Sequence, residues 1–296
     1  MSNAEGDGDP RVEFLAKLAK AESQYSDEND SAEARWMVVV ETVADRWRSS
    51  WRGQFPMAKP NLELANKFRV VFPLAAHALN HLDTAVSIQS CSPWVAVASA
   101  RIAFEHALTA QWVLWTEGGE DALRNQMSLQ DHKRSVEFVE AVKQAAAGSP
   151  SLAESAELAE ELGGYVGQRP SSDWSVFTLC ERFSDTRLLY GIYRDLSQAV
   201  HPSIGLVRAH FDITDPPNVV VGQIIPNGAG FDSVEVTRGL AVSGLWALYS
   251  LEISLDRRAA AKSVLQLGEE AGLPVDLRAS DLFPHLQPGY LSVFVP

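Results

Sequence analysis

The sequence is poor in cysteine. Cys91 and Cys180 are the only two thiols among its 296 residues. Two cysteines make neither a disulfide framework nor the paired spacing of a zinc site. We therefore expect both to be small buried side chains in a reduced protein.

Basic charge is also scarce. The chain has 25 Lys and Arg residues against 38 Asp and Glu residues, which gives a formal net charge of −13. The average field of such a protein repels polyanions, so bulk electrostatic binding of nucleic acid or of an anionic membrane is excluded. A nucleic acid partner would need a local cluster of basic residues.

Long apolar runs and targeting signals are missing as well. The longest apolar run, LAVSGLWALYSL at 240–251, is shorter than the roughly 18 to 20 residues that span a bilayer. The N-terminal segment MSNAEGDGDP lacks the basic and apolar regions of a signal peptide. The segment PNGAGF at 226–231 lacks the spacing of a phosphate-binding loop. We expect a cytoplasmic protein that has no membrane partner, and no motif indicates a cofactor.

The chain is rich in apolar residues at helical spacing. Hydrophobic residues make up 46% of it, eight of them tryptophan, which is ample material for a large core. The pattern repeats every three to four residues, so the sequence predicts an all-α helical bundle. We expect a single domain over 10–267, with its core at about 61–116 and 172–267. Residues 1–9 are expected to be disordered, and the irregular tail 268–296 to pack on the core or on a partner.

Local signals refine this prediction at several points. Ser31 is expected to cap a helix, and Pro73 to kink or divide the helix 62–89. One long helix is predicted from Ser233 to about Leu267. The segment 210–231 alternates β-branched runs with Pro, Asn and Gly, which predicts a short β-hairpin near 208–236.

The helix predicted at 94–116 is apolar almost all round but carries Arg101 and Glu105, one turn apart. Charged side chains on such a helix need partners, because an unpaired buried charge is very costly. One interpretation is a buried ion pair that fixes helix register. The other is that this pair lines a polar pocket together with a second polar stripe.

That second stripe lies in YGIYRDLSQAVHPS, residues 190–203. On a helix, Tyr190, Arg194, Ser197 and His201 fall within roughly 60° of one another. A histidine exchanges protons near neutral pH, as a general acid or base must. No glycine elbow surrounds Ser197, so it is not a nucleophile candidate. A polar network between helices, or a solvated face, remains the alternative.

The segment RDLSQAVH, from Arg194 to His201, resembles the Arg-x4-6-His signature of the HEPN (higher eukaryotes and prokaryotes nucleotide-binding) superfamily. Together with ARIAFEHAL near residue 100, it also resembles a bacterial helical family filed as a domain of unknown function. That wider likeness covers about residues 60–260. HEPN domains are compact helical bundles, often dimeric, and many are endoribonucleases of toxin–antitoxin, CRISPR and phage-defence systems.

The resemblance implies that Arg194 and His201 are catalytic and that the substrate is RNA, which supplies its own 2′-hydroxyl nucleophile. His201 would move protons, and Arg194 would stabilise the charged phosphorane. No metal is required. The resemblance further implies a homodimer in which two motifs meet, and an antitoxin or other partner protein.

Two other functions remain open on the sequence. The polar stripes would serve only packing in a non-catalytic interaction or regulatory module. A metal-binding bundle would use His77 and His81, which lie one turn apart close to Asp83. Ordinary packed histidines are the simpler interpretation of that pair.

Overall fold

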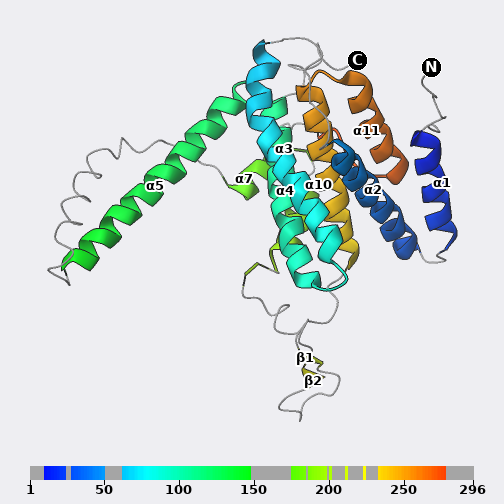
Figure 1. Cartoon of the computed structure of the whole chain (residues 1–296), viewed down its shortest axis with the longest axis horizontal. Coiled ribbons are helices and arrows are strands. Elements are labelled where there is room, and N and C mark those ends of the chain that lie inside the picture. Colours follow the sequence, from blue (N-terminus) through cyan, green and yellow to red (C-terminus); the bar gives the residue numbers. More distant parts are fainter. Residues whose placement is uncertain are drawn as a thin grey trace, which may run out of the picture. The chain divides into compact units, whose positions relative to one another are not determined.

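The structure is a computed structural model that describes residues 10–24, 28–50, 62–147, 175–184, 186–198, 200–201, 211–212, 223–224 and 233–277. The predictions for residues 1–9 and for most of the tail lie outside these ranges. The described helices are α1 (Pro10–Ser23), α2 (Glu28–Ser50), α3 (Leu62–Ile88), α4 (Pro93–Trp115), α5 (Gly119–Ala147), α7 (Val176–Glu181), α8 (Thr186–Ser197), α10 (Ser233–Ser254) and α11 (Arg258–Ala271) (Figure 1). The predicted all-α bundle is confirmed.

Two short strands lie within the segment where the sequence predicts a hairpin. Strand β1 (Phe211–Asp212) pairs antiparallel with β2 (Gln223–Ile224), with Phe211 opposite Ile224. No described helix combines the length and the apolar composition that crossing a membrane requires.

The chain divides into two compact units, whereas the sequence predicted one domain over 10–267. One unit combines Met1–Glu117 with Leu179–Pro296, and the other is Gly118–Thr178. The boundary falls at Gly118, whose φ of 66° is a left-handed conformation that glycine adopts without strain. Helix α5 belongs to the second unit.

Helices α3, α4 and α10 pack on one another at the centre of the first unit, and α2 packs on α3 and α10 (Figure 1). Helix α10 is the most buried of them, and every residue from Gly239 to Leu255 is buried. Its Trp246 ring lies 5.5 Å from that of Phe104 on α4. A Cβ at Gly244 would stand 2.6 Å from Leu82 on α3, so the close contact of these two helices requires glycine there.

A lysine in the core holds the end of α4. Lys67 is only 1% exposed, and its ammonium group donates to the carbonyls of Val113 (2.9 Å) and Thr116 (2.6 Å). The last carbonyls of a helix lack partners within the helix and carry the negative end of its dipole. A cation from α3 therefore satisfies them and joins α3 to α4.

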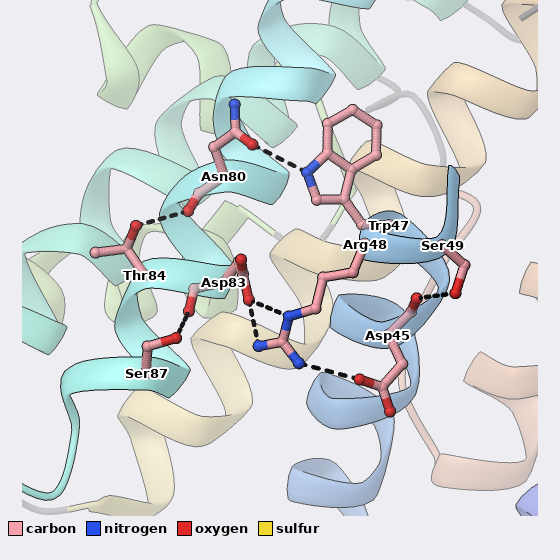
Figure 2. Close-up of polar contacts among 8 residues, drawn as sticks. All are labelled: Asp45, Trp47, Arg48, Ser49, Asn80, Asp83, Thr84 and Ser87. Atoms are coloured by element: carbon pink, nitrogen blue, oxygen red, sulfur yellow. Dashed lines mark hydrogen bonds and ion pairs between the residues drawn. The ribbon is translucent and has the colours of Figure 1, made fainter. Parts of the chain in front are cut away.

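Polar contacts also join α2 to α3, as Figure 2 shows. The Trp47 indole donates to the Asn80 side chain at 3.0 Å, and the Arg48 guanidinium bridges Asp83 on α3 and Asp45 on its own helix. Asp83 therefore pairs with an arginine of α2 rather than with the neighbouring histidines of α3.

Several local predictions are corrected. Ser31 lies inside α2, which already begins at Glu28, so it does not cap that helix. Pro73 lies inside a continuous α3 and does not divide it. Proline removes the hydrogen bond to the carbonyl four residues earlier, at Arg69. Because Arg69 and Pro73 are both exposed, water can hydrate that carbonyl.

The long helix predicted from Ser233 is in fact two helices. Asp256 adopts a φ of 56°, and Arg257 N–H donates to the Glu252 carbonyl at 2.8 Å, which closes the end of α10. Aspartate tolerates this left-handed conformation better than most residues do. The expectation of two buried thiols holds for Cys180, where burial raises the pKa to about 12, but Cys91 is exposed.

Near this break, the buried carboxylate of Glu252 faces two arginines. Its Oε1 lies 3.9 Å from Arg46 Nη2 and its Oε2 lies 3.2 Å from Arg257 Nε. Burial raises the Glu252 pKa, and the attraction of the two arginines only partly opposes it. Ionised Glu252 therefore costs the folded state free energy at neutral pH.

The Lys67 contact predicts a loss of stability on truncation. We expect Lys67→Met to lower the free energy of unfolding by about 2–4 kcal/mol, because two buried carbonyls lose charge-assisted hydrogen bonds. Urea unfolding followed by circular dichroism measures this. Lys262→Met, at an exposed position of α11, is the control and should change stability by less than about 0.5 kcal/mol. Equal effects of the two substitutions would contradict the capping role.

The Glu252 carboxyl predicts a pH dependence. A carboxyl whose folded pKa is raised binds its proton more tightly in the folded state, so stability rises as pH falls. As pH falls from 7, the free energy of unfolding of the wild type should therefore rise relative to that of Glu252→Gln. This rise should be complete below pH 4.5, the ordinary pKa of a glutamate. Urea titrations at each pH measure it. Glu269→Gln, at an exposed site, is the control, and its difference from the wild type should not change with pH in this way. A wild type that loses stability relative to Glu252→Gln as pH falls would refute the assignment.

Candidate functional site

Helix α8 carries the second polar stripe and is held against α4 and α10. Its apolar face is formed by three buried side chains: Leu189, Ile192 and Leu196. A Cβ at Gly239 of α10 would lie 3.2 Å from Leu196 and 3.3 Å from Ile192, so glycine allows α8 to approach closely. The opposite face of α8 is left to polar residues.

His201 lies beyond the helix and not on it, contrary to the stripe drawn from the sequence. Helix α8 ends at Ser197, and His201 N–H donates back to the Ser197 carbonyl at 3.3 Å in the following turn. The residue before a proline is disfavoured in the helical conformation, so Pro202 also prevents the helix from resuming at His201. The histidine side chain is exposed.

Arg101 is the centre of a polar cluster that joins α4 to α8. Its Nη1 lies 3.3 Å from His201 Nε2, its Nη2 donates to the Tyr193 hydroxyl at 3.0 Å, and its Nε donates to Glu105 Oε1 at 2.9 Å. The guanidinium carbon also lies 5.2 Å from the centroid of the Tyr193 ring, within cation–π range. Residues 101 and 201, a hundred positions apart, thus meet at one place.

The residues of the two stripes thus meet in part. Arg101 and Glu105 do meet His201, and the side chains of that ion pair are 15% and 29% exposed, so the pair is not deeply buried. A guanidinium has only donors, so in a hydrogen bond between Arg101 and His201 the acceptor is Nε2 of the histidine.

The other stripe residues have different surroundings. The Ser197 hydroxyl donates to the Tyr193 carbonyl at 2.6 Å within α8, so it is occupied. The Tyr190 ring stacks on that of Tyr193 at 5.9 Å between centroids. Arg194 is exposed, and no hydrogen bond or ion pair joins it to the residues that the structure describes.

The sequence stripe missed Tyr193. Tyr193 lies about 60° from Tyr190 on the helix, just outside the 60° sector that holds the four stripe residues. A slightly wider sector would have included Tyr193 and its hydroxyl. Tyr193 accepts from Arg101 and donates to no described residue, so its proton remains available to a ligand.

The histidine pair of α3 belongs to a group of three. The His77 ring lies 4.6 Å from His81 and 4.6 Å from His106 of α4, edge to face in both cases. His106 Nδ1 lies 2.8 Å from the Ile102 carbonyl, to which it donates. Burial is the main cause that lowers the pKa of both His81 and His106. Within the described part of the chain, no group of histidines, cysteines and carboxylates can hold a metal ion.

Comparison with known proteins identifies no family for this chain. No family model matches it, and no match is found among curated proteins or solved structures.

The Arg101 cluster predicts two different costs of truncation. Arg101→Ala removes three contacts and leaves Glu105 unpaired on a partly buried surface, so we expect it to lower the free energy of unfolding by about 1–2 kcal/mol. His201→Ala removes one contact of an exposed side chain and should cost less than about 0.5 kcal/mol. Chemical unfolding of both variants measures the difference. If the histidine variant is as destabilised as the arginine variant, the cluster acts as a packing lock.

Proposed function

We propose that this protein is a metal-independent endoribonuclease whose site is the Arg101 cluster. The observation that carries the proposal is the 3.3 Å approach of Arg101 to His201 beside the Tyr193 hydroxyl. It combines a permanent cation, an imidazole that can accept a proton and a phenol that can donate one. These are the groups that phosphodiester transfer needs when the nucleophile comes from RNA itself.

The reaction follows from these groups. An RNA phosphate draws the Arg101 guanidinium onto its oxygens, which frees His201 Nε2 to take the proton of the 2′-hydroxyl. The 2′-oxygen attacks phosphorus, and the bond from phosphorus to the 5′-oxygen breaks. The Tyr193 hydroxyl gives its proton to that leaving oxygen. The products are a 2′,3′-cyclic phosphate and a 5′-hydroxyl, and proton exchange with water restores both side chains.

Glu105 and Arg194 have supporting roles in this proposal. Glu105 holds the Arg101 side chain through its Nε and leaves both Nη groups directed at Tyr193 and His201. The exposed Arg194 guanidinium matches the oxygens of a neighbouring phosphate. Tyr190, stacked on Tyr193, offers an aromatic face to an unpaired base. The HEPN-like pair of Arg194 and His201 is thereby extended by an arginine from α4.

A dimer, a restraining partner protein and a cytoplasmic location belong to the same proposal. The chain is acidic overall, so an RNA site needs local positive charge. A second copy that brings its own Arg101 and Arg194 to the site would double that charge. An antitoxin-like partner would cover the exposed His201 and Arg194.

The second candidate is a non-catalytic interaction or regulatory module. The observation that favours it is that Arg101 already makes three contacts inside the protein, which is what a polar lock between α4 and α8 requires. In that case the cluster fixes the position of α8 and no substrate enters it.

Cleavage of a fluorescent single-stranded RNA by the purified protein tests the proposal. We expect cleavage that EDTA leaves unchanged, that yields 2′,3′-cyclic phosphate ends, and that fails on the same substrate with 2′-deoxy sugars. His201→Ala should lower the rate at least about 100-fold, the usual contribution of a general acid or base. Tyr193→Phe and Arg194→Ala should also lower it.

Arg187→Ala is the matched control, because Arg187 is an exposed arginine on α8 outside the cluster, and the substitution should leave the rate unchanged. Circular dichroism must show that each variant is folded. The interaction module would be favoured if the wild-type protein cleaved no RNA, either as a monomer or as a dimer. Cleavage that persists in His201→Ala would favour it too.

A further inference from the structure

A cavity of about 550 Å³ lies among α1, α2 and α11, and all three helices contribute side chains to its wall. Helix α2 contacts both of the other two (Figure 1). Arg11 on α1 donates twice to Glu270 on α11, through Nε at 3.0 Å and Nη2 at 2.8 Å, and so joins these two helices. The volume is in the range of small-molecule sites.

Glu270 is the acid of the wall that has the least contact with water. Both bonds from Arg11 end on its Oε1, whereas its Oε2 is buried and has no hydrogen-bond partner among the described residues. Leaving a buried acceptor without a donor is costly. Its side chain is 17% exposed, whereas the other two acids of the wall, Glu13 and Asp45, are 70% and 64% exposed and are screened by solvent. Glu270 is therefore the carboxylate of the wall that most needs a further donor.

Two hydroxyl groups of the wall can also act only as acceptors. Thr42 Oγ1 donates its hydrogen to the Val38 carbonyl at 2.7 Å, and Ser49 Oγ donates its own to the Asp45 carbonyl at 2.8 Å. A hydroxyl has one hydrogen and two lone pairs, so each oxygen still accepts but has nothing left to donate. A ligand rich in donors would satisfy these oxygens as well as Glu270.

The cationic side chains of the wall are already compensated by carboxylates at ion-pair distance. Arg11 has Glu270 at 2.8 Å, Lys17 has Glu13 at 3.0 Å, and Arg46 has Glu252 at 3.9 Å. Both arginines have further interactions within the protein. The whole chain carries a formal net charge of −13, so its average field attracts a cation and repels an anion.

A ligand in the cavity can reach the Glu270 carboxylate although its Oε2 is buried. The last torsion of a glutamate side chain is broad and roughly two-fold, so a small rotation lets the two oxygens share Arg11 and a ligand donor. The buried side chains of Phe14 and Leu267 also line the cavity, from α1 and α11. They offer an apolar surface next to the acceptors.

We propose that this cavity binds a small organic ammonium ion, a primary amine that carries an apolar group. The ammonium donates to the Glu270 carboxylate, and the Ser49 or Thr42 hydroxyl accepts another of its three hydrogens. The apolar group packs on the two apolar side chains of the wall. An organic cation fits better than a metal ion, because the described residues contain no group of carboxylates, histidines or cysteines arranged to hold one. This site is separate from the Arg101 cluster and does not depend on the proposed nuclease activity.

Isothermal titration calorimetry with 2-phenylethylamine at neutral pH tests the proposal, because this probe combines an ammonium group with an apolar ring. We expect saturable binding by the wild-type protein at one equivalent per chain. The neutral 2-phenylethanol and the anionic 3-phenylpropionate have similar shapes, and each should bind at least ten-fold more weakly. Benzylamine and hexylamine extend the panel to ammonium ions of other shapes.

Variants test the anchoring carboxylate. Glu270→Gln should weaken binding of the amine at least ten-fold, whereas Glu269→Gln removes the same charge from the neighbouring, exposed position of α11 outside the cavity wall and should leave binding unchanged. Thermal melting checks that Glu270→Gln is folded, and the comparison of the amine with the alcohol needs no variant. Failure of all three amines to bind, equal binding of the alcohol or of 3-phenylpropionate, or full binding by a folded Glu270→Gln would each overturn the proposal.

Discussion

The close packing of α10 is the constraint on which the core and the candidate site both depend. Gly244 lets α3 and α2 approach α10, since a side chain there would collide with Leu82 and press on Val43. Five residues earlier on the same helix, Gly239 does the same for α8. Because α4 also packs on α10, this one helix sets the distance between α4 and α8. The contact of Arg101 with Tyr193 and His201 is therefore a consequence of how tightly α10 is packed.

The core contains the ionisable side chains Lys67 and Glu252, and each has polar partners within the protein. Lys67 satisfies the terminal carbonyls of α4, so the charge supports a helix end that would otherwise lack partners. Glu252 has two arginines within ion-pair distance, yet burial still dominates its protonation. The Lys67 nitrogen lies 2.6 and 2.9 Å from its two carbonyl partners, whereas Glu252 has one arginine at 3.2 Å and another at 3.9 Å.

Sequence periodicity was sufficient for the all-α class and for most helices, since a stripe of apolar residues at helical spacing has few alternatives. The helix predicted at 94–116 matches α4 closely, since Pro93 at its first position and Gly118 after its end each act through their own backbone. The break at Asp256 was not predicted, since the residue has no obligatory backbone preference and α11 continues the same apolar pattern. The division into two units also depends on contacts that the pattern does not encode.

For the candidate site, the sequence alone singled out four residues, Arg101, Glu105, Arg194 and His201, and missed Tyr193. It also suggested that two polar stripes share a pocket. Only the tertiary structure decided the pairing, in which His201 meets Arg101 and Arg194 remains exposed. The physical reason is that spacing along a helix fixes directions within one helix only. The distance between residues 101 and 201 depends on how α4 and α8 pack against α10, and on where α8 ends.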